Sequence, residues 1–197
     1  MKIVDLYNST VADAVSAVAG VLRTPGSVAA VPTETVYGLV SALNAEGSER
    51  IYALKRRSGA KRLGWFVGNW RRLAEYGVEL TPLVVRLALR YTPGPVTIIA
   101  PDVSGNGIGF RVPDHPFLAA LLAEMETPLY QTSANLSGEP DALSLDDALA
   151  HLDGQVDISV NGGDLPPAAL ASTVVDARGE VPKILRQGAL KIDPADF

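Results

Sequence analysis

Segments with the apolar spacing of helices alternate with short apolar segments typical of strands along most of this chain. Residues 11–22 place valine and leucine on one helical face, and Pro25-Gly26 predicts a turn directly after them. Residues 27–31 have the short apolar pattern of a buried strand. Beyond residue 155 strand patterns dominate. The alternation predicts a mixed α/β fold around one sheet, with helices packed against it.

Polar capping residues and turn residues locate the other elements. Further helices are expected to begin near Ser48, Asn69, Thr81-Pro82, Asp114 and Ser144. Further strands are expected at 63–67, 95–100, 107–112, 128–132, 156–160, 172–176 and 182–186. The length of 197 residues suits one domain, and no repeat or linker interrupts the pattern. We therefore expect a single domain over residues 1–197.

The composition excludes several kinds of catalytic site. The absence of cysteine excludes disulfides, zinc–thiolate sites and a cysteine nucleophile, and two histidines are too few for a multi-histidine metal site. His115 precedes a helix, where a structural role is expected, and His151 is expected to face solvent. Neither a Walker A loop nor a GxSxG motif occurs. An enzyme of this composition would act by positioning and electrostatics, without a resident metal.

The sequence predicts a cytoplasmic protein without a membrane segment. No apolar run approaches the ~18 residues that a spanning helix needs. The first residues contain Asp5 and lack the basic and apolar regions of a signal peptide.

Positive charge is concentrated in one part of the chain. The net charge of −5 argues against a general nucleic-acid binder. From Arg50 to Arg72, however, there are eight basic residues and no acid, whereas Glu124 to Glu180 holds eleven acids and one base. Such a basic segment is either a solvated helix face or a site for an anion.

Hydroxyl-rich loops follow several of the expected strands. They lie at 32–38 and 132–138, a further hydroxyl-rich stretch opens the strand expected at 172–176, and the basic cluster at 55–61 follows a helix. Each loop alone is ordinary turn chemistry. Because ligands of α/β proteins bind at strand ends, the loops together predict a site for a polar molecule that carries phosphates.

Seven motifs in order identify a resemblance. They are 32–39 (PTETVYGL), Lys55-x-Arg57 with Lys61, 93–97, 111–116, 132–138, 172–176 and 184–188. With these motifs, which run from about residue 30 to 190, the chain resembles the YrdC/TsaC family of L-threonylcarbamoyladenylate synthases, in its short single-domain form.

The resemblance implies a twisted mixed sheet with a concave basic cavity. It also implies that L-threonine, bicarbonate or CO2, and ATP accompanied by Mg²⁺ give threonylcarbamoyl-AMP and pyrophosphate. No tightly bound cofactor is implied. The product would serve threonylcarbamoyladenosine modification of tRNAs that read ANN codons. The implied partners are therefore the downstream threonylcarbamoyl-transfer machinery, with tRNA or double-stranded RNA as a further candidate.

The resemblance also assigns residues. The catalytic cations would be Lys55, Arg57 and Lys61. ATP would be bound by these three and by Ser133, Asn135 and Arg186, with backbone near 107–109. L-threonine would be bound by Thr33, Arg111, Thr132 and Ser172. Tyr37 and Phe66 would either wall the pocket or pack in the core.

Three positions depart from the family's usual pattern. Ser58 and Arg62 stand where prolines are usual, and Trp65 stands in a strand that is usually aliphatic. The first two predict altered mobility of the loop that carries the cations. Two alternatives remain open: a non-catalytic protein that binds double-stranded RNA or tRNA, and a paralogue that lacks synthase activity.

Overall fold

One mixed sheet runs through the molecule. The computed structural model describes residues 2–193. The strands are β1 (Lys2–Asp5), β2 (Val28–Val31), β3 (Gly38–Ala42), β4 (Gly64–Phe66), β5 (Val96–Pro101), β6 (Gly107–Arg111), β7 (Leu129–Ser133), β8 (Ile158–Asn161), β9 (Thr173–Asp176) and β10 (Lys183–Arg186). Their order is β1-β8-β2-β3-β7-β4-β6-β5-β9-β10. Strand β2 pairs parallel with β8 and antiparallel with β3, so the predicted mixed sheet is confirmed.

Short helices flank the sheet. They are α1 (Val11–Leu22), α2 (Ala45–Leu54), the 3₁₀ helix η1 (Trp70–Tyr76), α3 (Pro82–Tyr91), α4 (Pro116–Met125) and α5 (Leu145–Ala150). Helix α1 begins where the Thr10 hydroxyl accepts a hydrogen bond from the Asp13 N–H, and Ser144 caps α5 in the same way. No helix in the described part of the chain has the length and apolar character that crossing a bilayer requires.

Two of the expected helix caps are wrong. Helix α2 begins earlier than Ser48, because Asn44 accepts a hydrogen bond from the Gly47 N–H at 2.7 Å. Asp114 does not cap α4: its backbone N–H donates to Glu34, and His115 holds the cap position without a side-chain hydrogen bond. In both cases a polar residue close to the true cap has another partner.

Strands β1 and β3 are not among the strands that the sequence predicts. Strand β1 lies at the edge of the sheet, where Ile3 is exposed, so its apolar pattern does not alternate as expected of a half-buried strand. Strand β3 is buried through Gly38–Ser41 and follows the hydroxyl-rich loop without an intervening turn signal. This strand matters for the site because it joins β2 to β7.

Helices cover both faces of the β2 region of the sheet. Successive side chains of a strand point to opposite faces, so Ala29 and Val31 pack with α1 and α4. Val28 and Ala30 pack on the other face with α2 and α5. Burial on both faces explains why this strand reads as a continuous apolar segment instead of an alternating one.

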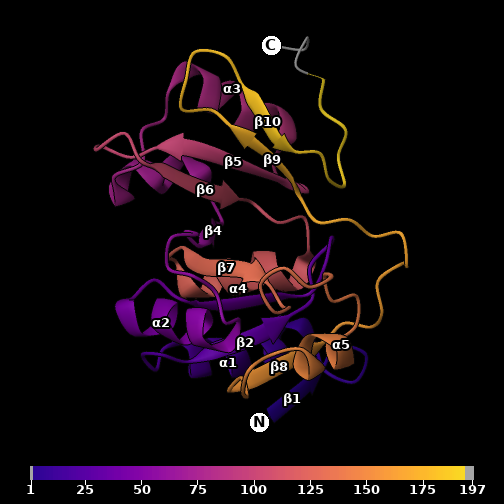
Figure 1. Ribbon diagram of the computed structural model, residues 1–197. Helices are drawn as coiled ribbons and strands as arrows, with labels where there is room; N and C mark the ends of the chain where they lie inside the picture. The colour runs from indigo at the N-terminus through magenta and orange to yellow at the C-terminus, as the bar shows by residue number, and fades with distance from the viewer. Residues whose placement is uncertain (1, 194–197) are drawn as a thin grey trace.

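The β5 region is covered on one face only. Val96, Ile98 and Ala100 pack in the core that contains α3 and η1. Figure 1 shows α3 beside β5, β9 and β10 at the top of the molecule, and α1, α2, α4 and α5 around the lower strands. Thr97 and Ile99 point to the opposite face, where they line a cavity. Alternation within one strand thus builds a core on one side and a binding surface on the other.

Candidate functional site

The open face of β5, β6 and β9 forms the floor of a cavity of about 590 Å³. The loop after α2, the end of β7 and the residues before β9 form its walls. Gly107 and Gly109 of β6 leave space at the floor of the cavity that a side chain would occupy. A Cβ at Gly107 would lie 2.6 Å from Ile99 Cγ2, and one at Gly109 would lie 3.3 Å from Thr97 Cγ2. The cavity therefore depends on two glycines as much as on the polar residues around them.

The described residues that line the cavity include cationic side chains and no carboxylate. The cationic residues are Arg57, Lys61, Arg62, Arg111 and Arg186. Like charges gathered around one cavity repel one another unless an anion is bound between them. This lining favours a ligand with several negative charges.

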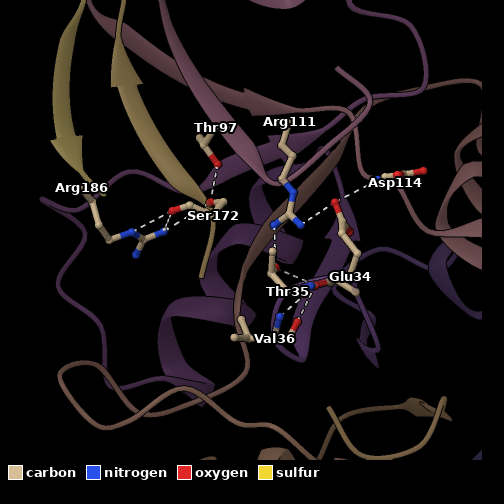
Figure 2. A network of polar contacts seen from close by, with 9 residues as sticks. Glu34, Thr35, Val36, Thr97, Arg111, Asp114, Ser172 and Arg186 are labelled. Atoms are coloured by element: carbon tan, nitrogen blue, oxygen red, sulfur yellow. Dashed lines mark hydrogen bonds and ion pairs between the residues drawn. The ribbon is translucent and has the colours of Figure 1, made fainter. Parts of the chain in front are cut away.

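Arg111 is held at the base of the cavity by the loop that follows β2 (Figure 2). Its side chain is only 5 % exposed, its Nη1 donates to Thr35 Oγ1 at 2.9 Å, and its Nη2 lies 2.7 Å from Glu34 Oε1. Burial lowers the pKa of Arg111, and the Glu34 carboxylate opposes that shift. Because a guanidinium keeps its proton in proteins, Arg111 is a fixed buried cation.

Part of the hydrogen-bonding capacity of Arg111 is unused. Nε of Arg111 lacks a hydrogen-bond acceptor, whereas Nη2 is paired with the Glu34 carboxylate at 2.7 Å. Buried donors without acceptors are costly. A carboxylate in the cavity is the kind of ligand that a buried guanidinium attracts.

A pair of hydroxyl groups lies beside a second arginine in the same cavity. Ser172 Oγ lies 2.8 Å from Thr97 Oγ1, and Arg186 Nε and Nη2 donate to the Ser172 carbonyl at 3.0 and 2.8 Å (Figure 2). Repulsion from Arg186 also lowers the pKa of Arg111, so the two guanidinium groups interact electrostatically. This part of the cavity offers two cations with hydroxyl groups nearby.

Lys55 lies behind the cavity wall instead of in it. Its side chain is fully buried, and its ammonium donates to the carbonyls of Ser133 and Asn135 and to Asn135 Oδ1. Burial lowers the pKa of Lys55 to about 8, with Arg57 acting in the same direction and Asp141 opposing. Asn135 Oδ1 also accepts from Ser133 Oγ at 2.6 Å. Lys55 thus fixes the loop that presents Ser133 to the cavity.

Arg57 closes the loop that carries the cations. Its Nε donates to the Lys61 carbonyl at 3.1 Å, and its Nη2 donates to the Arg62 carbonyl at 3.0 Å. Partial burial lowers the pKa of Arg57. Ser58 and Arg62 stand in this loop where prolines are usual in the family, and the Arg57 guanidinium joins its two ends.

The structure brings most of the predicted site residues to one cavity. Those that line it are Arg57, Lys61, Arg111, Thr132, Ser133, Ser172 and Arg186. Lys55, Asn135 and Thr33 lie behind the lining, and the Thr33 hydroxyl is engaged with the backbone of Thr35 and Val36.

The two aromatic residues and the two histidines considered as candidates do not line the cavity. Tyr37 and Phe66 are buried in core clusters and do not line the cavity, so core packing is the correct alternative for both. His115 is largely buried beside Phe117, and burial lowers its pKa. His151 is exposed at the end of α5, as predicted.

Several residues of the site have no role that the sequence alone predicts. Glu34 and Thr35 lie within a recognised motif but hold Arg111, which only the folded chain reveals. Arg62 was noted only as a departure from the family pattern, although it lines the cavity. Thr97 carried a usable signal, because a polar residue between Val96 and Ile98 indicates a strand face that is not core.

Fold and cavity together define an α/β protein whose open sheet face has the charge and donors of an anion-binding site. The sequence matches the family described as "Telomere recombination" (Sua5/YciO/YrdC) over residues 21–188. The chain therefore belongs to the Sua5/YciO/YrdC family.

Individual relatives agree with this assignment. Threonylcarbamoyl-AMP synthase of Pyrococcus abyssi is 30 % identical over 185 residues, covering 89 % of this chain and 54 % of that protein. The human threonylcarbamoyl-AMP synthase is 34 % identical over 166 residues, covering 77 % of this chain and 58 % of that protein. The chain thus spans a little over half the length of these curated relatives.

A solved structure supports the fold. The crystal structure of P. abyssi Sua5 complexed with L-threonine matches with a TM-score of 0.85 and 28 % identity, covering 96 % of this chain and 58 % of that chain. The match over nearly the whole described chain agrees with the mixed sheet and its flanking helices.

Substitution of Gly109 tests the cavity itself. Gly109→Val should weaken the binding of inorganic pyrophosphate by about tenfold, because overfilling a packed site commonly costs ~1–3 kcal/mol. Isothermal titration calorimetry measures the change. Gly20→Val is the matched control, since nothing lies within 4 Å of a Cβ at Gly20. Equal affinity for pyrophosphate in both variants would place the anion elsewhere.

The buried ammonium of Lys55 predicts a pH dependence of stability. Between pH 8 and 10.5 the unfolded chain holds a proton on Lys55 that the folded chain has lost, so the free energy of unfolding rises with pH across that interval. Chemical denaturation of the wild type and Lys55→Met should show this rise only in the wild type. Parallel pH profiles for the two proteins would contradict the burial argument.

Proposed function

We propose that this chain forms L-threonylcarbamoyl-AMP and pyrophosphate from L-threonine, bicarbonate or CO2, and ATP. The observation that carries the proposal is a cavity with five cationic side chains and no carboxylate among its described lining residues. The 30 % and 34 % identical relatives named threonylcarbamoyl-AMP synthase supply the reaction class. The product would pass to the enzymes that modify tRNA in the cytoplasm.

The Arg111 end of the cavity suits L-threonine. Arg111 lines the cavity as a fixed cation that attracts a carboxylate, and a hydroxyl can join the pair formed by Thr97 and Ser172. The relative of known structure, P. abyssi Sua5, was crystallised with L-threonine, which supports this choice of substrate. Thr132 lines the same cavity.

The loop after α2 suits the polyphosphate. Arg57, Lys61 and Ser133 line the cavity there, with the glycine backbone of β6 across from them. Mg²⁺ would enter as part of the substrate, bound to the phosphates of ATP. Among the described residues no cluster of three or more His, Asp or Glu side chains is placed to hold a metal ion on its own.

The reaction needs no protein nucleophile. The neutral amine of threonine attacks CO2 to give a carbamate and releases a proton to solvent, and a carbamate oxygen then attacks the α-phosphorus of ATP while the bond to pyrophosphate breaks. Negative charge accumulates on the leaving pyrophosphate, where Arg57 and Lys61 can offset it. Arg111 and the hydroxyl groups orient the attacking molecule, which lowers the barrier through positioning.

Charge pairing outside the cavity disfavours the RNA-binding alternative. Arg56 is paired with Asp153 at 2.8 Å, and Arg72 with Glu75 at 2.9 Å. These pairs neutralise exposed parts of the basic segment that a nucleic-acid backbone would need. Two other cations of the segment, Arg57 and Lys61, line the cavity instead.

Pyrophosphate release separates the synthase from a paralogue with the same fold. The purified chain is incubated with MgATP, bicarbonate and L-threonine, and pyrophosphate is followed with an enzyme-coupled assay. We expect release that requires threonine and is absent with D-threonine. Binding of ATP without threonine-dependent release would reject the synthase and favour the paralogue.

Arg57→Ala tests the role of the cations. Turnover should fall by more than tenfold, because removal of one preorganised electrostatic donor commonly costs ~10²-fold. Arg71→Ala is the matched control from the same basic segment: this guanidinium lies 4.4 Å from the centre of the Trp70 ring and does not line the cavity. Wild-type turnover in Arg57→Ala would show that the assignment is wrong.

A further inference from the structure

Arg62 lies at the boundary between two cavities. It lines the cationic cavity and also an adjoining one of about 220 Å³, and Leu63 and Gly107 are shared by both. Its Nη1 is 3.6 Å from Asp102 Oδ2 and 3.4 Å from the Gly107 carbonyl. The side chain is 58 % exposed. These are long contacts for a guanidinium, so Arg62 is held weakly by its present partners.

The Arg62 backbone and the Asp102 carboxylate are each held by shorter contacts than the one that joins Arg62 to Asp102. The Arg62 carbonyl accepts a hydrogen bond from Arg57 Nη2 at 3.0 Å. Asp102 Oδ1 accepts from the backbone N–H groups of Ser104 and Asn106, each at 2.8 Å. Only the side chain of Arg62 is therefore free to change partner, while its backbone and the carboxylate stay in place.

We propose that Arg62 is a nucleotide-binding residue whose guanidinium exchanges the Asp102 carboxylate for a phosphate of bound ATP. Arginine forms shorter, forked hydrogen bonds with phosphate oxygens, which a polyphosphate in the cavity would supply. Asp102 then acts as a competitor that lowers the affinity of the empty site for ATP. The inference rests on the proposed function in that ATP is the ligand.

A purely structural ion pair makes a different prediction. If Arg62 and Asp102 only joined the loop to the β5–β6 hairpin, removal of either charge would have the same effect on ATP binding. If they compete as proposed, the two removals have opposite effects. Asp102→Asn is a suitable substitution because its amide oxygen can still accept from Ser104 and Asn106.

The test measures the dissociation constants of ATP and inorganic pyrophosphate by isothermal titration calorimetry for four proteins: wild type, Arg62→Ala, Asp102→Asn and the double variant. Arg62→Ala should weaken binding of both ligands by about tenfold, as expected for a lost charge-assisted pair. Asp102→Asn should tighten binding by about threefold in the wild-type background and have no effect without Arg62. Thermal melts establish that the variants are folded. Arg71→Ala is the control for the loss of a positive charge outside the cavity.

Three results would overturn the proposal: unchanged affinity in Arg62→Ala, changes of the same sign in the two single variants, or equal tightening by Asp102→Asn with and without Arg62. The last result would mean that Asp102 weakens ATP binding through general electrostatic repulsion and not by competing for Arg62. Failure of the proposed function is a separate observation, because the wild type would then bind ATP without releasing pyrophosphate in response to threonine. A wild type that binds neither ATP nor pyrophosphate would overturn both.

Discussion

Side-chain alternation along β5 and β6 is the constraint on which the rest of the site depends. One face of these strands carries Ile98 and Phe110 into the core beneath α3, and the other carries Thr97 and Arg111 into the cavity. A shift of one residue in strand register would exchange the two sets. The apolar residues that stabilise this half of the molecule therefore also determine which groups face a ligand.

Electrostatics in this protein are divided between the exterior and the cavity. The net charge of −5 describes a surface on which arginines such as Arg56 are paired with acids. In the cavity the described lining holds cations without carboxylates, and the acid that approaches Arg111, Glu34, does so from outside that lining. This division lets an acidic protein offer a strongly cationic site.

Much of the fold could be predicted because its signals are local. The helix that begins at Thr10 and the one that begins at Thr81-Pro82 follow from caps and apolar spacing within a few residues. Strand β1 was missed because an edge strand lacks regular alternation, and β3 because it follows the 32–38 loop without a turn signal that marks where it begins. The cap of α2 was misplaced because Asn44 and Ser48 are equally plausible as isolated residues.

The site was predicted residue by residue but not in its arrangement. Family motifs pointed to Arg57, Arg111 and Ser172, which the fold brings to one cavity. The burial of Lys55 under the 133–139 loop and the contact between Arg62 and Asp102 depend on segments about 80 and 40 residues away. Contacts of this kind arise from strand order, which local sequence patterns do not specify.

The central claim is that one cavity joins threonine, CO2 and the α-phosphate of ATP. Mass spectrometry of the reaction in ¹³C-bicarbonate tests it most directly, because the product would carry the label and contain both threonine and AMP. The account predicts a threonine-dependent adenylate whose mass increases by one unit with the labelled bicarbonate. Formation of AMP or ADP without a labelled threonine adduct would contradict it.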